Sequence, residues 1–464
     1  MSNMNQEWPA SIPAPRQNPG KRDFSDPMRI FGKIETSLLK QSGGVMGAKV
    51  AQAVLGLATA LLLTRLFGAE VFGIYAYALA TSTLLSLFTR LGFHAQSIYA
   101  INRAFADDQR DRTFTIIATA LGTTAVLSAL GGASLYLISL FVPDWEMAPS
   151  LAYGAPLVLV SALVQVIGST ITAFGRVVTG ASVEAVVKPV IFLCAVGLLL
   201  LNASPEEIGY EGLLEAFIAS QILLCLMSGS YLLWLARRES GPFRLYPKDI
   251  WPNVIEAKTF MMANAMLRLY QDMGTMSVGI FFGPVEVAFY RVADQASALI
   301  LFGFQALQAV LRPRIAKAYA IGGEVKAQLQ SQLTTITRWL AILESPLMLS
   351  MIFASPWVVL VFGKDFGEAA PVLTILAVGQ AFGVLCGLNG DMLNMTGHAN
   401  IAARWAVAAL MVTAVLLWPA TLMFGLYGPA LAVATTRILW NVALARSARQ
   451  LTGIHTTVLG APRA

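Results

Sequence analysis

Twelve apolar stretches, each about long enough to cross a lipid bilayer, occupy this chain from near residue 44 to near residue 446. A bilayer core is about 30 Å thick and an α-helix rises about 1.5 Å per residue, so roughly 20 apolar residues span it. Charged residues make up 12% of the chain, against roughly 25% in soluble domains. The sequence therefore predicts an all-α polytopic membrane protein with about twelve transmembrane helices. We place them at 44–66, 71–92, 113–142, 149–173, 182–203, 212–236, 257–282, 286–311, 334–361, 369–393, 401–424 and 427–446.

Lysine and arginine gather in every second connection between these stretches, and cytoplasmic loops of membrane proteins retain positive charge. The basic set includes the N-terminal tail, the linker near 237–258 and the C-terminal end. The alternate connections hold the basic residues Arg65 and Lys364 and carry the acids Asp144, Glu146, Glu206, Glu207 and Glu211. Both termini are therefore predicted to be cytoplasmic. The net charge of +6 reflects this topology and gives no reason to expect nucleic-acid binding.

Two sequence patterns recur at nearly one offset. The first joins spans one and two as Phe67-Gly68-x4-Gly73-x-Tyr75, and 215 residues later joins spans seven and eight as Phe282-Gly283-x4-Ala288-x-Tyr290. The second precedes the last span of each half, as Gly209-x2-Gly212-x3-Ala216 and, 216 residues later, Gly425-x2-Gly428-x3-Ala432. Repeats of six spans share one orientation, so we expect two parallel six-helix lobes around a central cavity. A simple recurrence of glycine and aromatic residues in short hairpins is the alternative, and it does not explain the constant offset.

The expected organisation has five parts: a disordered cytoplasmic tail at 1–40, an N-terminal six-helix lobe at 41–236, a cytoplasmic linker at 237–256, a C-terminal six-helix lobe at 257–450 and a cytoplasmic tail at 451–464. The first 40 residues contain several prolines and lack the apolar core of a signal peptide. Cys194, Cys225 and Cys386 fall inside predicted spans, with no spacing that suggests a metal site or a disulfide framework.

Several segments together suggest a family. These are "LLLTRLFGAEVFGIYAYALATSTLLSLFTRLGF" in the first two spans, "FGPVEVAFYRVADQ" and "VLRPRIAKAYAIGG" around the eighth, and "FGLYGPALAVATT" at the start of the last. Over residues 38–450 the chain resembles bacterial polysaccharide biosynthesis and O-antigen flippases of the multidrug/oligosaccharidyl-lipid/polysaccharide exporter superfamily. The related flippase for the peptidoglycan precursor typically has fourteen spans, so twelve spans argue against that branch.

The resemblance implies a multi-pass protein of the cell inner membrane. Such a protein flips an undecaprenyl-diphosphate-linked oligosaccharide to the periplasmic leaflet by ion-coupled alternating access, for O-antigen, capsule or exopolysaccharide assembly. The implied partners are that substrate, membrane lipids and polysaccharide assembly proteins. No cofactor is expected.

Five basic residues within predicted spans are candidate substrate-binding residues: Lys49, Lys188, Arg268, Arg291 and Arg437. An arginine at mid-bilayer costs about 2.5–3.5 kcal/mol on insertion scales, so it usually faces a wet cavity or a partner. Arg268 and Arg437 are expected near the midplane. A diphosphate carries about two negative charges, and the planar guanidinium suits phosphate oxygens. The alternative for Arg268 is a structural pair with Asp272, one helical turn away.

Two acids within spans, Glu344 and Asp272, are candidates for ion coupling, because a carboxyl group in an apolar site can bind and release a proton. Pro346 follows Glu344 and would free a backbone carbonyl there. Asp294 lies three residues after Arg291, a spacing that favours a local ion pair. The sequence shows no phosphate-binding glycine loop, no histidine spacing typical of a metal site and no nucleophile with a base.

Two other functions remain open. A multidrug/cation antiporter of the same superfamily would be expected to have an acidic or aromatic cavity, whereas Arg437 has no carboxylate three or four residues away. A membrane polysaccharide polymerase or ligase would present large extracytoplasmic loops, and the longest here runs only from about 202 to 211. The sequence therefore predicts a transporter and not an enzyme.

Overall fold

The computed structural model describes residues 27–240 and 243–460, with side chains described from residue 43 on except at 259–260, 262–268, 306, 309–310, 313, 324–325 and 327. Every element in this part of the chain is helical, so the expected all-α fold class is confirmed. Nine segments of the described residues are long and apolar enough to cross a membrane. One of them, Gly43–Thr89, covers two predicted spans. The predicted spans outside the nine segments lie on the helices that carry Asp272 and Arg437.

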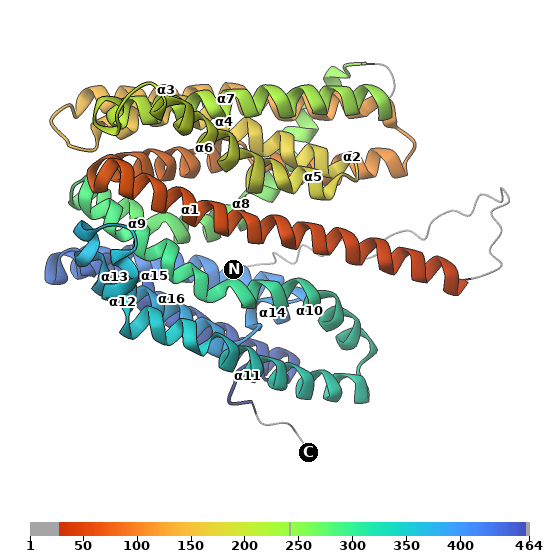
Figure 1. Ribbon diagram of the computed structural model, residues 1–464. Coiled ribbons are helices and arrows are strands. Elements are labelled where there is room, and N and C mark those ends of the chain that lie inside the picture. Colours follow the sequence, from red (N-terminus) through yellow and green to blue (C-terminus); the bar gives the residue numbers. More distant parts are fainter. Residues whose placement is uncertain (1–26, 241–242, 461–464) are drawn as a thin grey trace, which may run out of the picture. The chain divides into compact units, whose positions relative to one another are not determined.

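The described residues of the first half of the chain form seven α-helices and two short turns (Figure 1). Helices α3, α4 and α7 pack side by side, with α2 against α4 and α6 against α7. The elements are α1 (Pro27–Thr89), α2 (Phe93–Ala106), η1 (Arg110–Arg112), α3 (Thr113–Phe141), α4 (Ala148–Ala173), α5 (Val177–Ser182), the π-helical turn η2 (Val183–Val187), α6 (Lys188–Leu200) and α7 (Pro205–Glu239).

Within residues 243–460, the second half forms nine α-helices and two 3-10 turns. Helix α16 packs against α13 and α15, α13 also contacts α9 and α11, and α8 packs against α15. The elements are α8 (Pro247–Phe281), α9 (Pro284–Ala298), η3 (Leu299–Leu301), α10 (Phe302–Ile321), α11 (Gly323–Phe353), α12 (Ser355–Leu360), η4 (Lys364–Glu368), α13 (Ala369–Cys386), α14 (Asn389–Met395), α15 (Ala399–Phe424) and α16 (Tyr427–Thr452).

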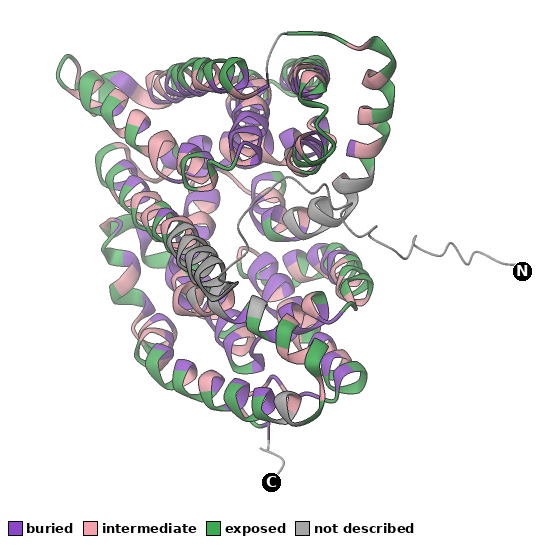
Figure 2. Cartoon of the chain, turned by 90° about the vertical axis from the view of Figure 1, so that its right-hand side faces the viewer, coloured by how far each residue is buried: buried purple, intermediate pink, exposed green. Residues whose placement is uncertain are grey.

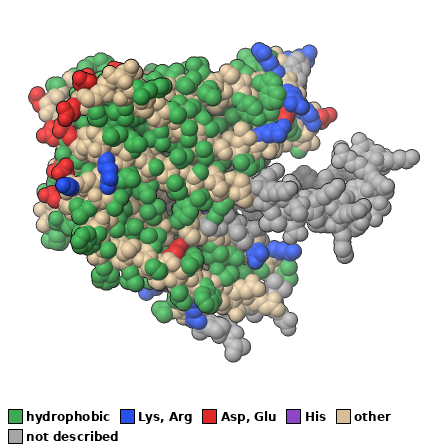
Figure 3. Space-filling view, in the orientation of Figure 1, with side chains coloured by type: hydrophobic (Ala, Val, Ile, Leu, Met, Phe, Trp, Pro, Cys, Tyr) green, Lys and Arg blue, Asp and Glu red, His purple; other side chains and the backbone are tan. Residues whose placement is uncertain are grey.

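The connections between helices alternate between two ends of the bundle. We call the end that holds 142–147, 201–204 and 361–368 the acidic end, and the end that holds 107–112, 237–240 and 243–246 the basic end. On the face shown in Figure 3, acidic side chains gather at one end and most lysine and arginine side chains at the other. The folded chain thus keeps the charge separation that the sequence predicted.

Glycines with a left-handed backbone break the long helices at the predicted connections. Gly68 (φ 80°, ψ 180°) kinks α1 between the first two predicted spans. Gly209 (φ 55°, ψ −162°) and Gly425 (φ 58°, ψ −132°), the matched glycines of the second sequence repeat, adopt similar conformations. A side chain at such angles is strained, which explains why these positions hold glycine. The matched glycines of the first sequence repeat, Gly68 and Gly283, differ in backbone conformation, because Gly283 has a φ of −94°.

Large apolar side chains cover much of the outer surface of the helices. Figure 2 shows buried and exposed residues interspersed along individual helices. Phe141, Leu343, Phe353 and Trp357 are each at least three-quarters exposed. Such extensive exposed apolar surface is unfavourable in water and is what a lipid-facing surface requires. The outer surface of the helices is therefore that of a membrane protein.

The predicted linker at 237–256 is partly helical and is anchored to the first half. The backbone N–H of Tyr246 donates to Thr115 Oγ1 (2.9 Å), and its hydroxyl donates to Asp111, which holds the pKa of that carboxyl below its usual range. Within α8, Asp249 pairs with Arg112 (3.5 Å), and Gln96 Nε2 donates to Glu256 Oε2 (3.1 Å). Helix α8 therefore starts on the first half and ends among the helices of the second. Most of the predicted tail at 1–40 lies outside the described residues, and α1 begins at Pro27.

The segment that follows α16 packs against the second half. We call residues 453–460 the C-terminal strap. Val458 N donates to Leu385 O (3.0 Å) and Thr456 Oγ1 donates to Cys386 O (3.1 Å), where α13 stops before Gly387. Arg338 of α11 donates to the carbonyls of Val458 and Gly460. The strap thus supplies hydrogen bonds that the break between α13 and α14 leaves open.

Ending the chain at Thr452 should lower its stability, because a hydrogen bond of this kind contributes about 0.5–1.5 kcal/mol and several would be lost together. Thermal unfolding of the purified protein in detergent measures the effect, with Cys194 and Cys225 replaced by alanine so that a thiol-reactive dye reports on buried Cys386. A chain ending at Gly460 retains the contacts of the strap and serves as the control. Equal unfolding temperatures for the two truncations would show that the strap does not stabilise the break.

Candidate functional site

Arg437 of α16 interacts with two tyrosines, Tyr270 of α8 and Tyr290 of α9. The Tyr270 hydroxyl of α8 donates to the carbonyl of Val433 on α16 (3.4 Å) and interacts with the Arg437 guanidinium one turn further along. Arg437 Nη1 is buried and has no hydrogen-bond partner among the described residues. A cationic nitrogen that is buried without a partner loses hydration that nothing replaces, so an anion reaching it would be bound favourably.

Helix α9 brings a second group of polar side chains to the same place. Tyr290 is buried against α8, where a Cβ at Gly274 would lie 1.8 Å from its hydroxyl oxygen. The charges of Asp294, Arg437 and Arg291 all act on that hydroxyl. Arg291 pairs with Asp294 (3.8 Å), as their spacing predicted. We call Tyr270, Tyr290, Arg291, Asp294 and Arg437 the cationic cluster.

Lys188 is the first residue of α6, in the first half of the chain. It follows the wide turn η2, where Pro189 lacks the N–H that would close a regular helical turn onto Ala185. Its Nζ lies 5.7 Å from the centre of the Phe217 ring, close enough for a cation–π interaction. Phe217 packs edge-on against Tyr75 (5.3 Å between centroids), and the charge of Arg291 acts on Tyr75. Two aromatic rings thus separate Lys188 from the cationic cluster.

The group that we call the cationic cluster does not include Asp272, Arg268 and Lys49, which the sequence also predicted as site residues. Asp272 is 4% exposed on α8, two residues after Tyr270. Arg268 is on the same helix, but its side chain lies outside the described residues, and so does its predicted pairing with Asp272. Lys49 is exposed on α1, about one turn beyond Gly44, which lies against Val178 of α5.

Glu344 has a structural contact that the sequence did not reveal. It is 6% exposed on α11, and its Oε1 accepts the backbone N–H of Phe304 (2.9 Å) in the first turn of α10. The first N–H groups of a helix lack partners within the helix, so this carboxylate caps α10 where the 3-10 turn η3 separates it from α9. The other oxygen, Oε2, is buried without a hydrogen-bond partner in the described part of the chain.

Sequence reasoning missed the tyrosines, although a signal for them existed. Tyr75 and Tyr290 occupy the same position of the first repeat, and both prove to be buried beside basic side chains. Because Tyr290 precedes Arg291 and recurs as Tyr75 in the first half, the repeat could have predicted both tyrosines as site residues. Among the described residues, no group of three His, Cys, Asp or Glu side chains could hold a metal ion.

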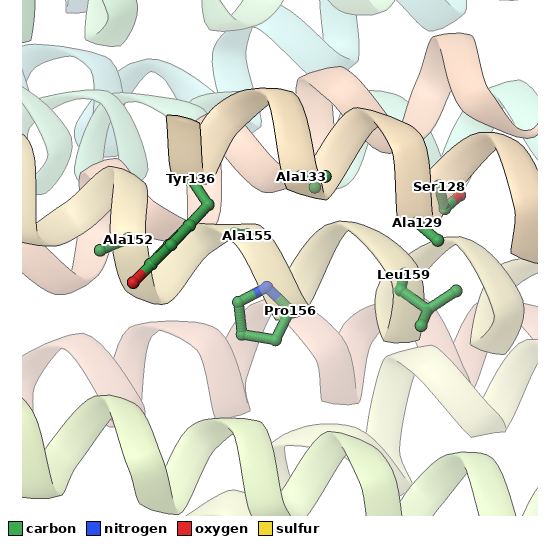
Figure 4. Close-up of a pocket in the computed structure, with 9 residues that line it drawn as sticks. Ser128, Ala129, Ala133, Tyr136, Ala152, Ala155, Pro156 and Leu159 are labelled. Carbon is green, nitrogen blue, oxygen red and sulfur yellow. The ribbon is translucent and has the colours of Figure 1, made fainter. Parts of the chain in front are cut away.

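A separate apolar hollow of about 410 Å³ lies between α3 and α4. Figure 4 shows Tyr136, Pro156 and Leu159 along it, on two adjacent helices. None of the predicted site residues lines this hollow. It is therefore distinct from the cationic cluster.

Comparisons with known proteins bear on the family and on the fold. At 21% identity over 199 residues, the chain aligns with the teichuronic acid biosynthesis protein TuaB of Bacillus subtilis (strain 168), covering 42% of this chain and 41% of that protein. The fold is similar to a structure of the lipid II flippase MurJ in an inward closed conformation (TM-score 0.67, 14% identity, 87% of each chain). It is also similar to an inward-facing MATE multidrug resistance transporter of the MOP superfamily (TM-score 0.62, 12% identity, 90% of this chain and 94% of that one).

Both structural relatives are transporters, and at these identities they establish the fold alone. The match to a family model is more direct. It covers residues 38–319, more than half of the chain, and the model describes polysaccharide biosynthesis proteins. The resemblance inferred from the sequence motifs is confirmed: this chain belongs to the polysaccharide biosynthesis protein family, on the fold of the MOP-superfamily transporters.

Proposed function

We propose that this protein flips an undecaprenyl-diphosphate-linked oligosaccharide from the cytoplasmic to the periplasmic leaflet of the inner membrane. The observation that carries the proposal is the buried Arg437 nitrogen without a partner among the described residues, beside Tyr270 and Tyr290. Family membership supports a role in polysaccharide assembly. The relative named for teichuronic acid biosynthesis and the structural relative named as a lipid II flippase point to the same substrate class.

The chemistry of such a substrate explains why basic residues would be needed in a membrane. A diphosphate cannot cross hydrocarbon unaided, because transferring an isolated ion out of water costs tens of kcal/mol. The charge of the diphosphate would be shielded in turn by Arg437 and Arg291 in the second half and by Lys188 in the first. Lys49, which is exposed, is a further proposed contact, and so is Arg268. The prenyl chain remains in lipid.

Ion coupling belongs to the proposal as well. Glu344 and Asp272 are both at least 94% buried and have carboxyl groups that could exchange a proton. Glu344 is the stronger candidate, because one of its oxygens already holds the break before α10 while the other lacks a partner among the described residues. Gain or loss of a proton there would alter the cap, and through it the junction between α9 and α10.

A cation antiporter is the second candidate, favoured by the tyrosines and acids near Arg437 and by the fold of the MATE transporter. Proteoliposomes distinguish the two functions. We expect a fluorescent short-chain prenyl-diphosphate saccharide to be flipped, and a neutral prenyl saccharide and a hydrophobic drug cation to be ignored. Transport of the cation alone would replace our proposal with the antiporter.

We propose an inner-membrane location with both termini in the cytoplasm. A single cysteine at exposed Glu206, on the acidic end, should react with an impermeant thiol reagent in intact cells. A cysteine at exposed Gln109, on the basic end, should react only after the inner membrane is permeabilised. The reverse pattern would invert the orientation, and with it the proposed direction of transport.

A further inference from the structure

The two halves of the chain touch at the acidic end through glycines. Gly73 of α1 is buried directly against Pro284, the first residue of α9. A Cβ at position 73 would lie 1.8 Å from the Pro284 carbonyl oxygen and 2.5 Å from its carbon. Both are backbone atoms, which cannot turn away as the end of a flexible side chain can.

A second glycine makes the reciprocal contact from the other half. Gly279, near the end of α8, lies beneath the ring of Tyr77 from α1, where a Cβ would lie 2.0 Å from Tyr77 Cε2. Tyr77 is 3% exposed and packs edge-on against Trp145 of the α3–α4 connection (5.9 Å between centroids). The ring is therefore held from both sides.

Polar contacts join the same end. Arg65 Nε donates to the carbonyl of Val361, 296 residues away (2.8 Å). The Glu146 carboxylate of the first half lies against Gly283 of the second. Arg65 is one of the few basic residues at the acidic end, so a contact role accounts for its presence there.

The buried apolar side chains also join the two halves mainly at the acidic end. One apolar cluster is shared by both halves and includes Phe72 and Tyr75 of α1 together with Val278, Val287 and Phe289. Two other clusters each stay within one half. One contains Ile101, Ile171 and Leu235, and the other contains Leu311, Leu333 and Met392. The largest core is thus shared by the halves at the acidic end, whereas towards the basic end most of the core lies within each half and a small cluster joins them, in which Ala257 of α8 packs with Phe93, Ala120 and Val166.

We propose that the contacts of Gly73 with Pro284 and of Gly279 with Tyr77 form a gate at the acidic end, and that the gate closes only because both positions lack a side chain. The inference rests on the proposed transport function, since a gate matters only if the two ends open in turn. Any side chain at position 73 holds α1 and α9 apart. The protein then occupies states in which the acidic end is open.

Distances between spin labels at Glu70 and Lys364 test the proposal without any substrate. Both residues are exposed at the acidic end and lie in different halves. The three native cysteines are first replaced by alanine. We expect one short distance in this background, and in Gly73→Ala and Gly279→Ala a rise on the order of tenfold in the ratio of long to short distances.

Matched variants separate gating from misfolding. Gly122→Ala on α3 is the control, because a Cβ there meets nothing within 4 Å and the distances should not change. In the Gly279→Ala/Tyr77→Ala double variant the obstructing ring is gone, so the short distance should return. Unchanged distances in both single glycine variants, at normal thermal stability, would overturn the gate. If the spin-label distances change as expected but the parent protein does not flip the prenyl-diphosphate saccharide, the gate is supported and the proposed substrate is wrong.

Discussion

Replacing Arg437 by alanine is expected to slow flipping of the prenyl-diphosphate saccharide strongly, the largest effect we expect from a single substitution. Hydrogen bonds to charged groups contribute about 1.5–3 kcal/mol, and each 1.4 kcal/mol changes a binding constant about tenfold. Losing one such bond should therefore reduce the transport rate about 10- to 100-fold, and more if two of the three guanidinium nitrogens contact the diphosphate. Flipping in proteoliposomes and surface polysaccharide in cells both report the loss.

The chain offers a matched control for this variant. Arg446 lies on the same helix, α16, and is exposed near the basic end, so Arg446→Ala should retain near-normal flipping. Arg437→Lys keeps the charge but not the planar fork, and should restore part of the activity. Normal export by the Arg437→Ala protein at normal abundance would remove Arg437 from the proposed substrate path.

Replacing Glu344 by glutamine should remove the response of transport to a pH gradient, the second largest effect. The glutamine carbonyl can still accept the N–H of Phe304, so the cap on α10 is retained while the proton-binding group is lost. We therefore expect a protein of parental thermal stability that binds substrate but is not accelerated by an imposed gradient. Flipping rates in proteoliposomes, with and without the gradient, measure the effect.

A second substitution separates the two roles of Glu344. Glu344→Leu removes both the cap and the proton site, and loss of a helix cap costs about 0.5–2 kcal/mol of stability. Its unfolding temperature should therefore fall below that of the Gln variant. If the Gln protein responds to the gradient as the parent does, Glu344 is a cap alone and Asp272 becomes the coupling candidate.

The sequence alone determined where most of the long apolar helices lie and in what order, although the predicted spans at 286–311, 334–361 and 369–393 are each divided between two helices. The predicted spans at 113–142, 149–173 and 401–424 match α3, α4 and α15 to within two residues. This succeeds because bilayer thickness, helix rise and the unfavourable transfer of charge are local constraints that each stretch must satisfy by itself. The same reasoning explains the separation of charge between the two ends, and the repeat located the breaks at Gly209 and Gly425.

The tertiary structure alone decided what each polar residue meets. Glu344 caps a helix that begins some 40 residues earlier in the chain, Gly73 lies against Pro284, and Arg437 lies beside two tyrosines from other helices. Helices that are apolar on most sides have little sequence periodicity to show which face turns inward. Their rotation and crossing depend on packing between distant segments, and those contacts decide which buried charge is paired and which is left for a ligand.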